Sequence, residues 1–161
     1  PAISARLMTI LSDAVGRAGL IGGQATDLLA TDQQISFETL ERIHRGKTGA
    51  LFSAAATAGA VVSGASADSI RSLSAYAKNL GLAFQIIDDL LDVEGDPGIL
   101  GKAVQKDQAA GKVNFVSLLG VQGAQDRVRY LAAQAKQHLA QFGVRAASLL
   151  HTVDFVLNRR H

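Results

Sequence analysis

The sequence contains no cysteine and no tryptophan, and it has only two prolines among 161 residues. The lack of cysteine excludes disulfides and thiolate catalysis, and it is typical of a reducing compartment, so we expect a cytoplasmic protein. Aromatic residues make up 5% of the chain, whereas hydrophobic residues make up 48%. Alanine, leucine and glycine dominate, and this mix favours helices that pack closely through small side chains.

A large excess of charge is also lacking. The chain has 16 Lys and Arg against 14 Asp and Glu, which gives a formal net charge of +2. No basic run is interleaved with aromatic residues, so the sequence does not predict nucleic-acid binding. No signal or transit segment is visible. Because the chain opens at Pro1 and not at a methionine, we expect it to be part of a longer polypeptide.

One stretch, from Gly49 to Ala67, carries no charge at all. Its length is that of a membrane-spanning helix, but most of its residues are Ala, Gly, Ser and Thr. Such a composition is more typical of a buried helix that packs through small side chains than of a segment in lipid. We therefore expect no membrane span.

Apolar residues recur at spacings of three and four along nearly the whole chain, and no segment alternates with the period of a strand. Ser36 is a predicted N-cap, Ser66 or Asp68 another, and Gly64 a predicted helix stop. No linker or low-complexity segment divides the chain, so we predict a single all-α domain over residues 1–161. The predicted helices, with their caps, span residues 5–15, 20–30, 36–63, 66–93, 114–119, 124–142 and 146–158, with a polar loop at 100–111.

The fourth predicted helix carries a cluster of negative charge within an apolar run, FQIIDDLLDVEGD. Asp88 and Asp92 are four residues apart and Asp89 lies three before Asp92, so we expect all three carboxylates on one helix face, with Gln85 on the same stripe. Like charges in a partly buried helix repel unless a cation lies between them. Magnesium and calcium prefer carboxylate oxygens, so the pattern predicts a metal site. The alternative is a solvated acidic face.

Positive side chains accompany the acidic helix on both sides along the chain. Lys102, Lys106 and Lys112 follow it, and a basic cluster lies upstream within residues 42–48. Magnesium bridges carboxylates to phosphates, and lysines bind free phosphate oxygens. Together these residues indicate a site for a diphosphate ester and a metal, whereas each lysine alone is more typical of a solvated surface.

The stretch LGLAFQIIDDLLD, Leu80 to Asp92, resembles the second aspartate-rich motif of the trans-isoprenyl diphosphate synthases, the polyprenyl synthetase family. Three other stretches agree with that family in order and approximate spacing, namely GLIGGQATDL (19–28), HRGKTGALFSAA (44–55) and LGKAVQKDQAAGK (100–112). The resemblance covers nearly the whole chain and is closest in detail to bacterial farnesyl and geranyl diphosphate synthases. It implies a helical bundle of the isoprenoid synthase type.

The resemblance also implies an activity. Family members condense an allylic diphosphate with isopentenyl diphosphate and release pyrophosphate, which implies a prenyltransferase that requires Mg²⁺. Asp88 and Asp92, supported by Asp89, would hold the magnesium ion on the allylic diphosphate. A homodimer is a further expectation from the family.

Other positions take roles from the same resemblance. The lysines implied to bind the diphosphate oxygens are Lys47, Lys102 and Lys112. Thr48 and Gln85 match positions that face the allylic cation and the proton that is lost in the last step. Gln24 and Asp27 would line the same cavity.

The chain departs from the family pattern in what it lacks. The family uses two aspartate-rich motifs on facing helices, and this chain contains one. The first motif and the Gly-Lys-x-x-Arg site for isopentenyl diphosphate are both absent from the 161 residues. We therefore expect the C-terminal half of a synthase, inactive alone. A non-catalytic partner subunit and a terpene cyclase are the alternatives, although the retained Lys47 and Thr48 favour condensation over cyclisation.

A second departure lies at Val113 to Val116, where the family usually has a small residue followed by Thr-Tyr-Pro. We expect this change to alter the start of a helix and not the chemistry, because Asn114 can still act as an N-cap.

Overall fold

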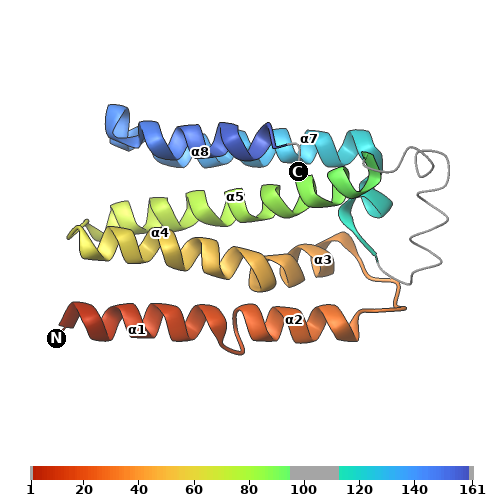
Figure 1. Cartoon of the computed structure of the whole chain (residues 1–161), viewed down its shortest axis with the longest axis horizontal. Coiled ribbons are helices and arrows are strands. Elements are labelled where there is room, and N and C mark those ends of the chain that lie inside the picture. The colour runs from red at the N-terminus through yellow and green to blue at the C-terminus, as the bar shows by residue number, and fades with distance from the viewer. Residues whose placement is uncertain (1, 95–112, 160–161) are drawn as a thin grey trace.

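The fold is a bundle of antiparallel helices, seen in a computed structural model that describes residues 2–94 and 113–159 (Figure 1). These residues contain helices and connections but no strand, so the all-α prediction is confirmed. The α-helices are α1 (Ala2–Val15), α2 (Leu20–Leu29), α3 (Phe37–His44), α4 (Ala50–Val62), α5 (Ala67–Glu94), α7 (Phe115–Leu139) and α8 (Ala147–Leu157).

The helices form layers, as Figure 1 shows. Helices α1 and α2 run end to end along one side of the bundle, and α3 and α4 lie beside them. Helix α5 occupies the middle, and α7 and α8 cover its other side. The long α5 therefore contacts both halves of the bundle, and the acidic motif lies at one of its ends.

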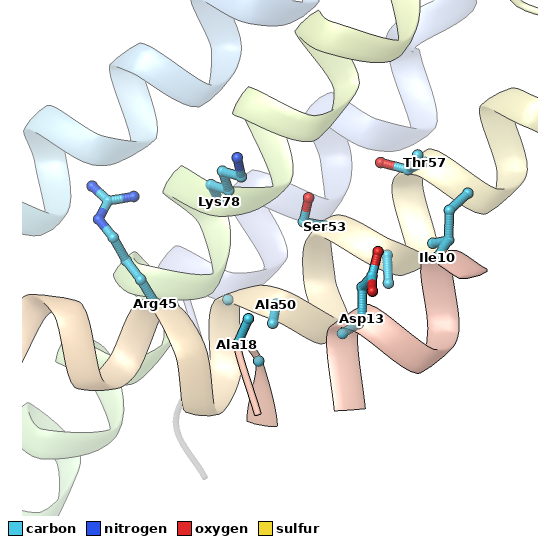
Figure 2. A pocket seen from close by; sticks show the side chains of 12 residues that line it. Ile10, Asp13, Ala18, Arg45, Ala50, Ser53, Thr57 and Lys78 are labelled. Carbon is cyan, nitrogen blue, oxygen red and sulfur yellow. The ribbon is translucent and has the colours of Figure 1, made fainter. Parts of the chain in front are cut away.

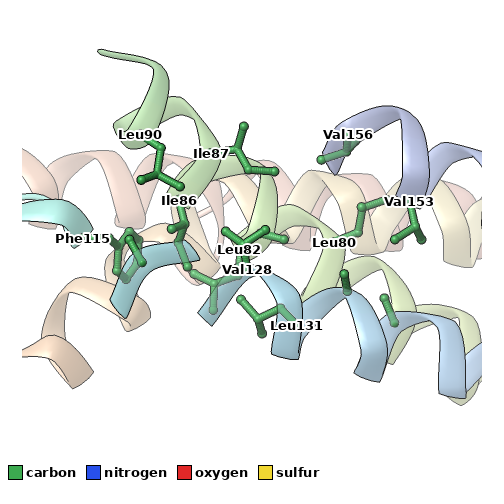
Figure 3. Close-up of a cluster of buried hydrophobic side chains, with 14 of the residues drawn as sticks. Leu80, Leu82, Ile86, Ile87, Leu90, Phe115, Val128, Leu131, Val153 and Val156 are labelled. Carbon is green, nitrogen blue, oxygen red and sulfur yellow. The ribbon is translucent and has the colours of Figure 1, made fainter. Parts of the chain in front are cut away.

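The core is centred on α5 and the helices that cover it (Figure 3). Leu82 and Ile86 of α5, Phe115 and Leu131 of α7, and Val153 of α8 are all almost completely buried. Burying each such side chain stabilises the fold by about 1.5–3 kcal/mol relative to leaving it exposed.

Several predicted helix ends are confirmed. The Ser36 hydroxyl accepts a hydrogen bond from the Thr39 backbone N–H at 3.3 Å, so Ser36 caps α3. Ser66 accepts one from the Ser69 N–H at 3.2 Å and caps α5. Gly64 follows α4 with a φ of +69°, a left-handed conformation that suits glycine and ends the helix.

Two boundaries differ from the prediction. The single helix predicted over residues 36–63 is divided between α3 and α4 by a π-helical turn, Arg45–Gly49, which we call the π turn. The two helices predicted over 114–119 and 124–142 correspond to the two parts of α7, which are separated at Gly120, a non-helical kink with a φ of 68°. Helix α7 ends at Leu139, and a 3₁₀ segment, η2 (Ala140–Ala146), leads into α8.

The start of α7 shows the cap that the sequence suggested. The Asn114 side chain accepts a hydrogen bond from the Ser117 N–H at 2.7 Å, and the Ser117 hydroxyl accepts one from the Asn114 N–H at 3.0 Å. These reciprocal bonds form a capping box, which satisfies backbone donors that have no partner inside the helix.

Asn114→Ala is therefore expected to lower the free energy of unfolding by about 1 kcal/mol, because the first turn of α7 loses its cap. Urea denaturation followed by circular dichroism measures the change. Gln137→Ala is the control, since it alters an exposed polar position near the other end of the same helix. Equal unfolding midpoints for Asn114→Ala and the unaltered chain would contradict the prediction.

Among the residues that the structure describes, no helix has both the length and the hydropathy needed to cross a membrane. Helix α4, which contains most of the uncharged stretch, packs against α1 and α5 instead.

Candidate active site

The approach of α2 to the π turn places the first pair of predicted site residues together. Gly23 lies so close to the turn that a Cβ atom there would be 2.2 Å from the Lys47 backbone nitrogen. Only glycine permits this contact. One turn further along α2, the Asp27 carboxylate accepts a hydrogen bond from Lys47 Nζ, with 2.7 Å between Oδ2 and Nζ.

The exposure of this ion pair suits a binding role. The Asp27 side chain is 9% exposed, whereas that of Lys47 is 28% exposed. Asp27 is therefore held in place within the bundle, while part of the Lys47 side chain remains accessible. Gln24, another predicted site residue, lies one turn before Asp27 on α2. The structure thus brings Asp27 and Lys47 into contact and places Gln24 on the same helix face.

The π turn itself carries Lys47 and Thr48. A π turn is rare and occurs frequently at functional sites, because the extra residue changes the direction of the side chains around it. The spacing of the apolar residues predicts an uninterrupted helix here and does not indicate the turn.

A chain of hydrogen bonds leads from the π turn to α5. The Thr48 hydroxyl donates to Gln85 Oε1 at 3.2 Å, and Gln85 Nε2 lies 3.4 Å from Asp89 Oδ1. Asp89 Oδ2 accepts a hydrogen bond from the Phe115 backbone N–H at 2.9 Å. The orientation of the Gln85 amide is therefore fixed at both its oxygen and its nitrogen.

Asp89, one of the three predicted metal ligands, differs from Asp88 and Asp92 in its burial and in its partner. It is a buried residue, with 7% exposure, and it binds the N-terminal end of α7. The physical reason is that the first backbone N–H groups of a helix have no partner within it, and a carboxylate satisfies them. Asp88 is partly exposed and Asp92 exposed, one turn apart on α5.

Asp88 has a partner that the sequence analysis did not foresee. The Arg159 guanidinium, which follows the end of α8, forms an ion pair with Asp88 Oδ1. The same guanidinium lies 4.1 Å from the centre of the Phe84 ring. The spacing of residues along the sequence does not indicate this contact, because Arg159 and Asp88 are far apart in the chain.

We call the gathered side chains the polar stripe, and its members are Asp27, Lys47, Thr48, Gln85 and Asp88. Its elements are α2, the π turn and α5. Lys102 and Lys112, predicted to bind diphosphate oxygens, lie outside the described residues.

The donors present suit magnesium, although they do not complete a site. Among residues 2–94 and 113–159, no group of three or more acidic or histidine side chains is arranged to hold a metal ion. Magnesium usually binds one or two carboxylates and takes its remaining ligands from waters and substrate phosphates. Asp88 and Asp92, one helical turn apart at the accessible end of the polar stripe, fit that requirement.

A separate cavity of about 530 Å³ lies between α1, α4 and α5 (Figure 2). Asp13, Arg45 and Lys78 are among its lining residues, together with the hydroxyls of Ser53 and Thr57. Part of this polar surface is already paired, because Arg45 binds Glu41 at 2.6 Å and Ser53 lies 2.8 Å from Ser74. None of the predicted site residues lines the cavity.

Comparison with known proteins identifies the family. The family model for polyprenyl synthetase matches residues 2–147. A dimethylallyltranstransferase of Fischerella ambigua is 44% identical over 157 residues, which is 97% of this chain and 45% of that protein.

Comparison with solved structures gives the same family. A farnesyl/geranylfarnesyl (FPP/GFPP) synthase from Zymomonas mobilis matches with a TM-score of 0.85 and 37% identity, covering 97% of this chain and 51% of the other. A geranyltransferase from Helicobacter pylori, solved with magnesium and isoprenyl diphosphate, has a TM-score of 0.76 and 29% identity, over 98% of this chain and 52% of that one. The chain thus spans about half the length of these relatives. By sequence and by fold, the chain belongs to the polyprenyl synthetase family.

Proposed function

We propose that the polar stripe binds an allylic diphosphate through Mg²⁺ and forms one half of the active site of a short-chain prenyl diphosphate synthase. In that reaction the allylic group is transferred to isopentenyl diphosphate. The observation that carries the proposal is the contact of Lys47 and Thr48 with Asp27 and Gln85, one turn from Asp88, in an otherwise apolar bundle.

Breaking the bond between the allylic carbon and the diphosphate oxygen leaves negative charge on the departing group. When bound at Asp88 and Asp92, magnesium would neutralise much of that charge. Lys47 adds a positive charge on the same side, and its ion pair with Asp27 at 2.7 Å holds the ammonium in position. Lys102 and Lys112 are proposed to bind further diphosphate oxygens.

Thr48 and Gln85 are proposed to face the allylic cation and the proton that leaves at the end of the reaction. Their mutual hydrogen bond of 3.2 Å keeps two oxygen atoms at fixed positions beside the stripe. Fixed dipoles stabilise developing positive charge without the cost of reorienting water. Asp89 is proposed to act indirectly, since it orients Gln85 and binds the start of α7.

The chain is proposed to need a second half. Its relatives are about twice its length, and the family resemblance implies a first aspartate-rich motif that faces α5 across the substrate. We therefore expect these 161 residues alone to bind a magnesium diphosphate complex without condensing it with isopentenyl diphosphate.

Isothermal titration of the 161-residue chain with dimethylallyl thiolodiphosphate tests the binding step. We expect heat of binding only when Mg²⁺ is present, and its loss in Asp88→Asn, which keeps the size of the side chain but removes its charge. Asp126→Asn, an exposed carboxylate on α7, is the matched control and is expected to bind as the unaltered chain does. Binding that is equally strong without Mg²⁺, or in Asp88→Asn, would contradict the proposal.

A further inference from the structure

The contact between Arg159 and Asp88 pairs a side chain of this protein with the carboxylate that is proposed to hold magnesium. We infer that the Arg159 guanidinium is an internal competitor of the metal, which occupies Asp88 until Mg²⁺ displaces it. The inference rests on the proposed function, because it takes Asp88 to be a magnesium ligand.

The position of Arg159 is specific. Its guanidinium lies 4.1 Å from the centre of the Phe84 ring, and Phe84 is one helical turn before Asp88 on α5. The ring face attracts the cation, and the carboxylate of Asp88 binds its edge. The Arg159 side chain is 19% exposed in this position. A solvated surface arginine would not be held by two partners at once.

The same position leaves one donor of the guanidinium unsatisfied. Arg159 Nε is buried and has no hydrogen-bond partner among the described residues. A buried donor without a partner costs about 1–3 kcal/mol. The arrangement in which Arg159 binds Asp88 therefore carries this desolvation cost at Nε, which the ion pair offsets. When the Arg159 side chain leaves Asp88, Nε can bind water and this cost is removed. The contact is therefore reversible.

Binding of Arg159 to Asp88 and binding of magnesium to Asp88 oppose each other. Both cations seek the same carboxylate, and a guanidinium that stayed beside a divalent ion would experience direct like-charge repulsion. Thermodynamic coupling is reciprocal. The factor by which bound metal weakens the contact between Arg159 and Asp88 is therefore the factor by which that contact weakens the apparent affinity for the metal.

Movement of Arg159 requires little rearrangement of the bundle. Helix α8 ends at Leu157, and Asn158 Nδ2 donates to the Asp154 carbonyl oxygen at 2.7 Å, closing the last turn. Arg159 therefore lies just beyond the helix, where its N–H makes a single long hydrogen bond to the Val156 carbonyl oxygen, at 3.4 Å. The metal can displace the guanidinium without unfolding α8.

Titration of the 161-residue chain with Mn²⁺, followed by the electron paramagnetic resonance signal of the free ion, tests the inference. Mn²⁺ takes the same oxygen ligands as Mg²⁺ and is observed directly. Arg159→Gln is expected to lower the apparent Kd for Mn²⁺ on the order of tenfold, because the competitor is removed. Arg145→Gln removes a positive charge from an exposed position in η2 and is expected to leave the Kd unchanged.

Asp88→Asn separates this inference from the proposed function. If Asp88→Asn weakens Mn²⁺ binding while Arg159→Gln leaves it unchanged or weaker, Asp88 is a metal ligand and the competition is disproved. If Asp88→Asn binds Mn²⁺ as tightly as the unaltered chain, the metal assignment itself fails, and the inference with it. Support requires that Arg159→Gln tightens binding only where Asp88 is intact, which the double variant Asp88→Asn/Arg159→Gln measures.

Discussion

Under the proposed function, replacing Asp88 with alanine is expected to lower prenyl transfer by about 10²–10³-fold or more, because the site would lose one preorganised group proposed to stabilise charge on the departing diphosphate. The measurement requires a complete active site. A suitable protein is a chimera in which these 161 residues replace the matching half of the Zymomonas mobilis synthase, to which they are 37% identical. Incorporation of radiolabelled isopentenyl diphosphate into prenyl products reports turnover.

The fold and the chemistry can be separated in that experiment. Asp88 is partly exposed, so its truncation should leave the circular dichroism spectrum and the thermal unfolding of the chimera nearly unchanged. Asp126→Ala, which removes an exposed carboxylate from α7, is expected to retain normal turnover. Near-normal turnover in Asp88→Ala would refute the metal role of this residue.

The second large effect is expected at Gly23. A Cβ atom there would be 2.2 Å from the Lys47 backbone nitrogen and 2.8 Å from the Gly46 carbonyl carbon. These are backbone atoms that cannot rotate away, so Gly23→Ala must separate α2 from the π turn. We expect the free energy of unfolding to fall by about 3 kcal/mol or more, since overpacking against backbone is costlier than against side chains.

Gly59→Ala provides the contrasting case. Gly59 lies within α4 and has open space where its Cβ would be placed. Alanine there should stabilise the helix by about 0.5–1 kcal/mol, because glycine is a poor helix former. Urea denaturation of both variants measures the difference. Equal stabilities would show that the contact between α2 and the π turn is not as close as described.

The helix pattern was readable from the sequence because its signals are local. Ser36, Ser66 and Gly64 act through bonds or dihedral angles within a few residues, and the structure places each where the prediction did. The proximity of Gln85 and Asp89, four residues apart on α5, was readable for the same reason, since helical spacing fixes which residues share a face.

The features that sequence reasoning missed depend on partners far along the chain. Asp89 was expected beside Asp88 and Asp92, and spacing alone did not indicate that the Phe115 N–H, 26 residues later, donates a hydrogen bond to its carboxylate. Arg159 reaches Asp88 only because α8 folds back along α5. Local spacing contains no information about either contact, which arises from how the layers pack.

The π turn has a consequence for the helical register. In an uninterrupted helix, Lys47 would fall two turns after the buried Leu40 and so lie on the core-facing stripe. The π turn behaves as a one-residue insertion in the helical repeat. His44 and Gly49, five residues apart, are both buried, and Lys47 is rotated out toward Asp27. Deleting one residue between 45 and 49 would remove that insertion and restore an ordinary helix, so α4 would keep its present face toward α5 while the side chains of the turn, Lys47 among them, would lose their present direction.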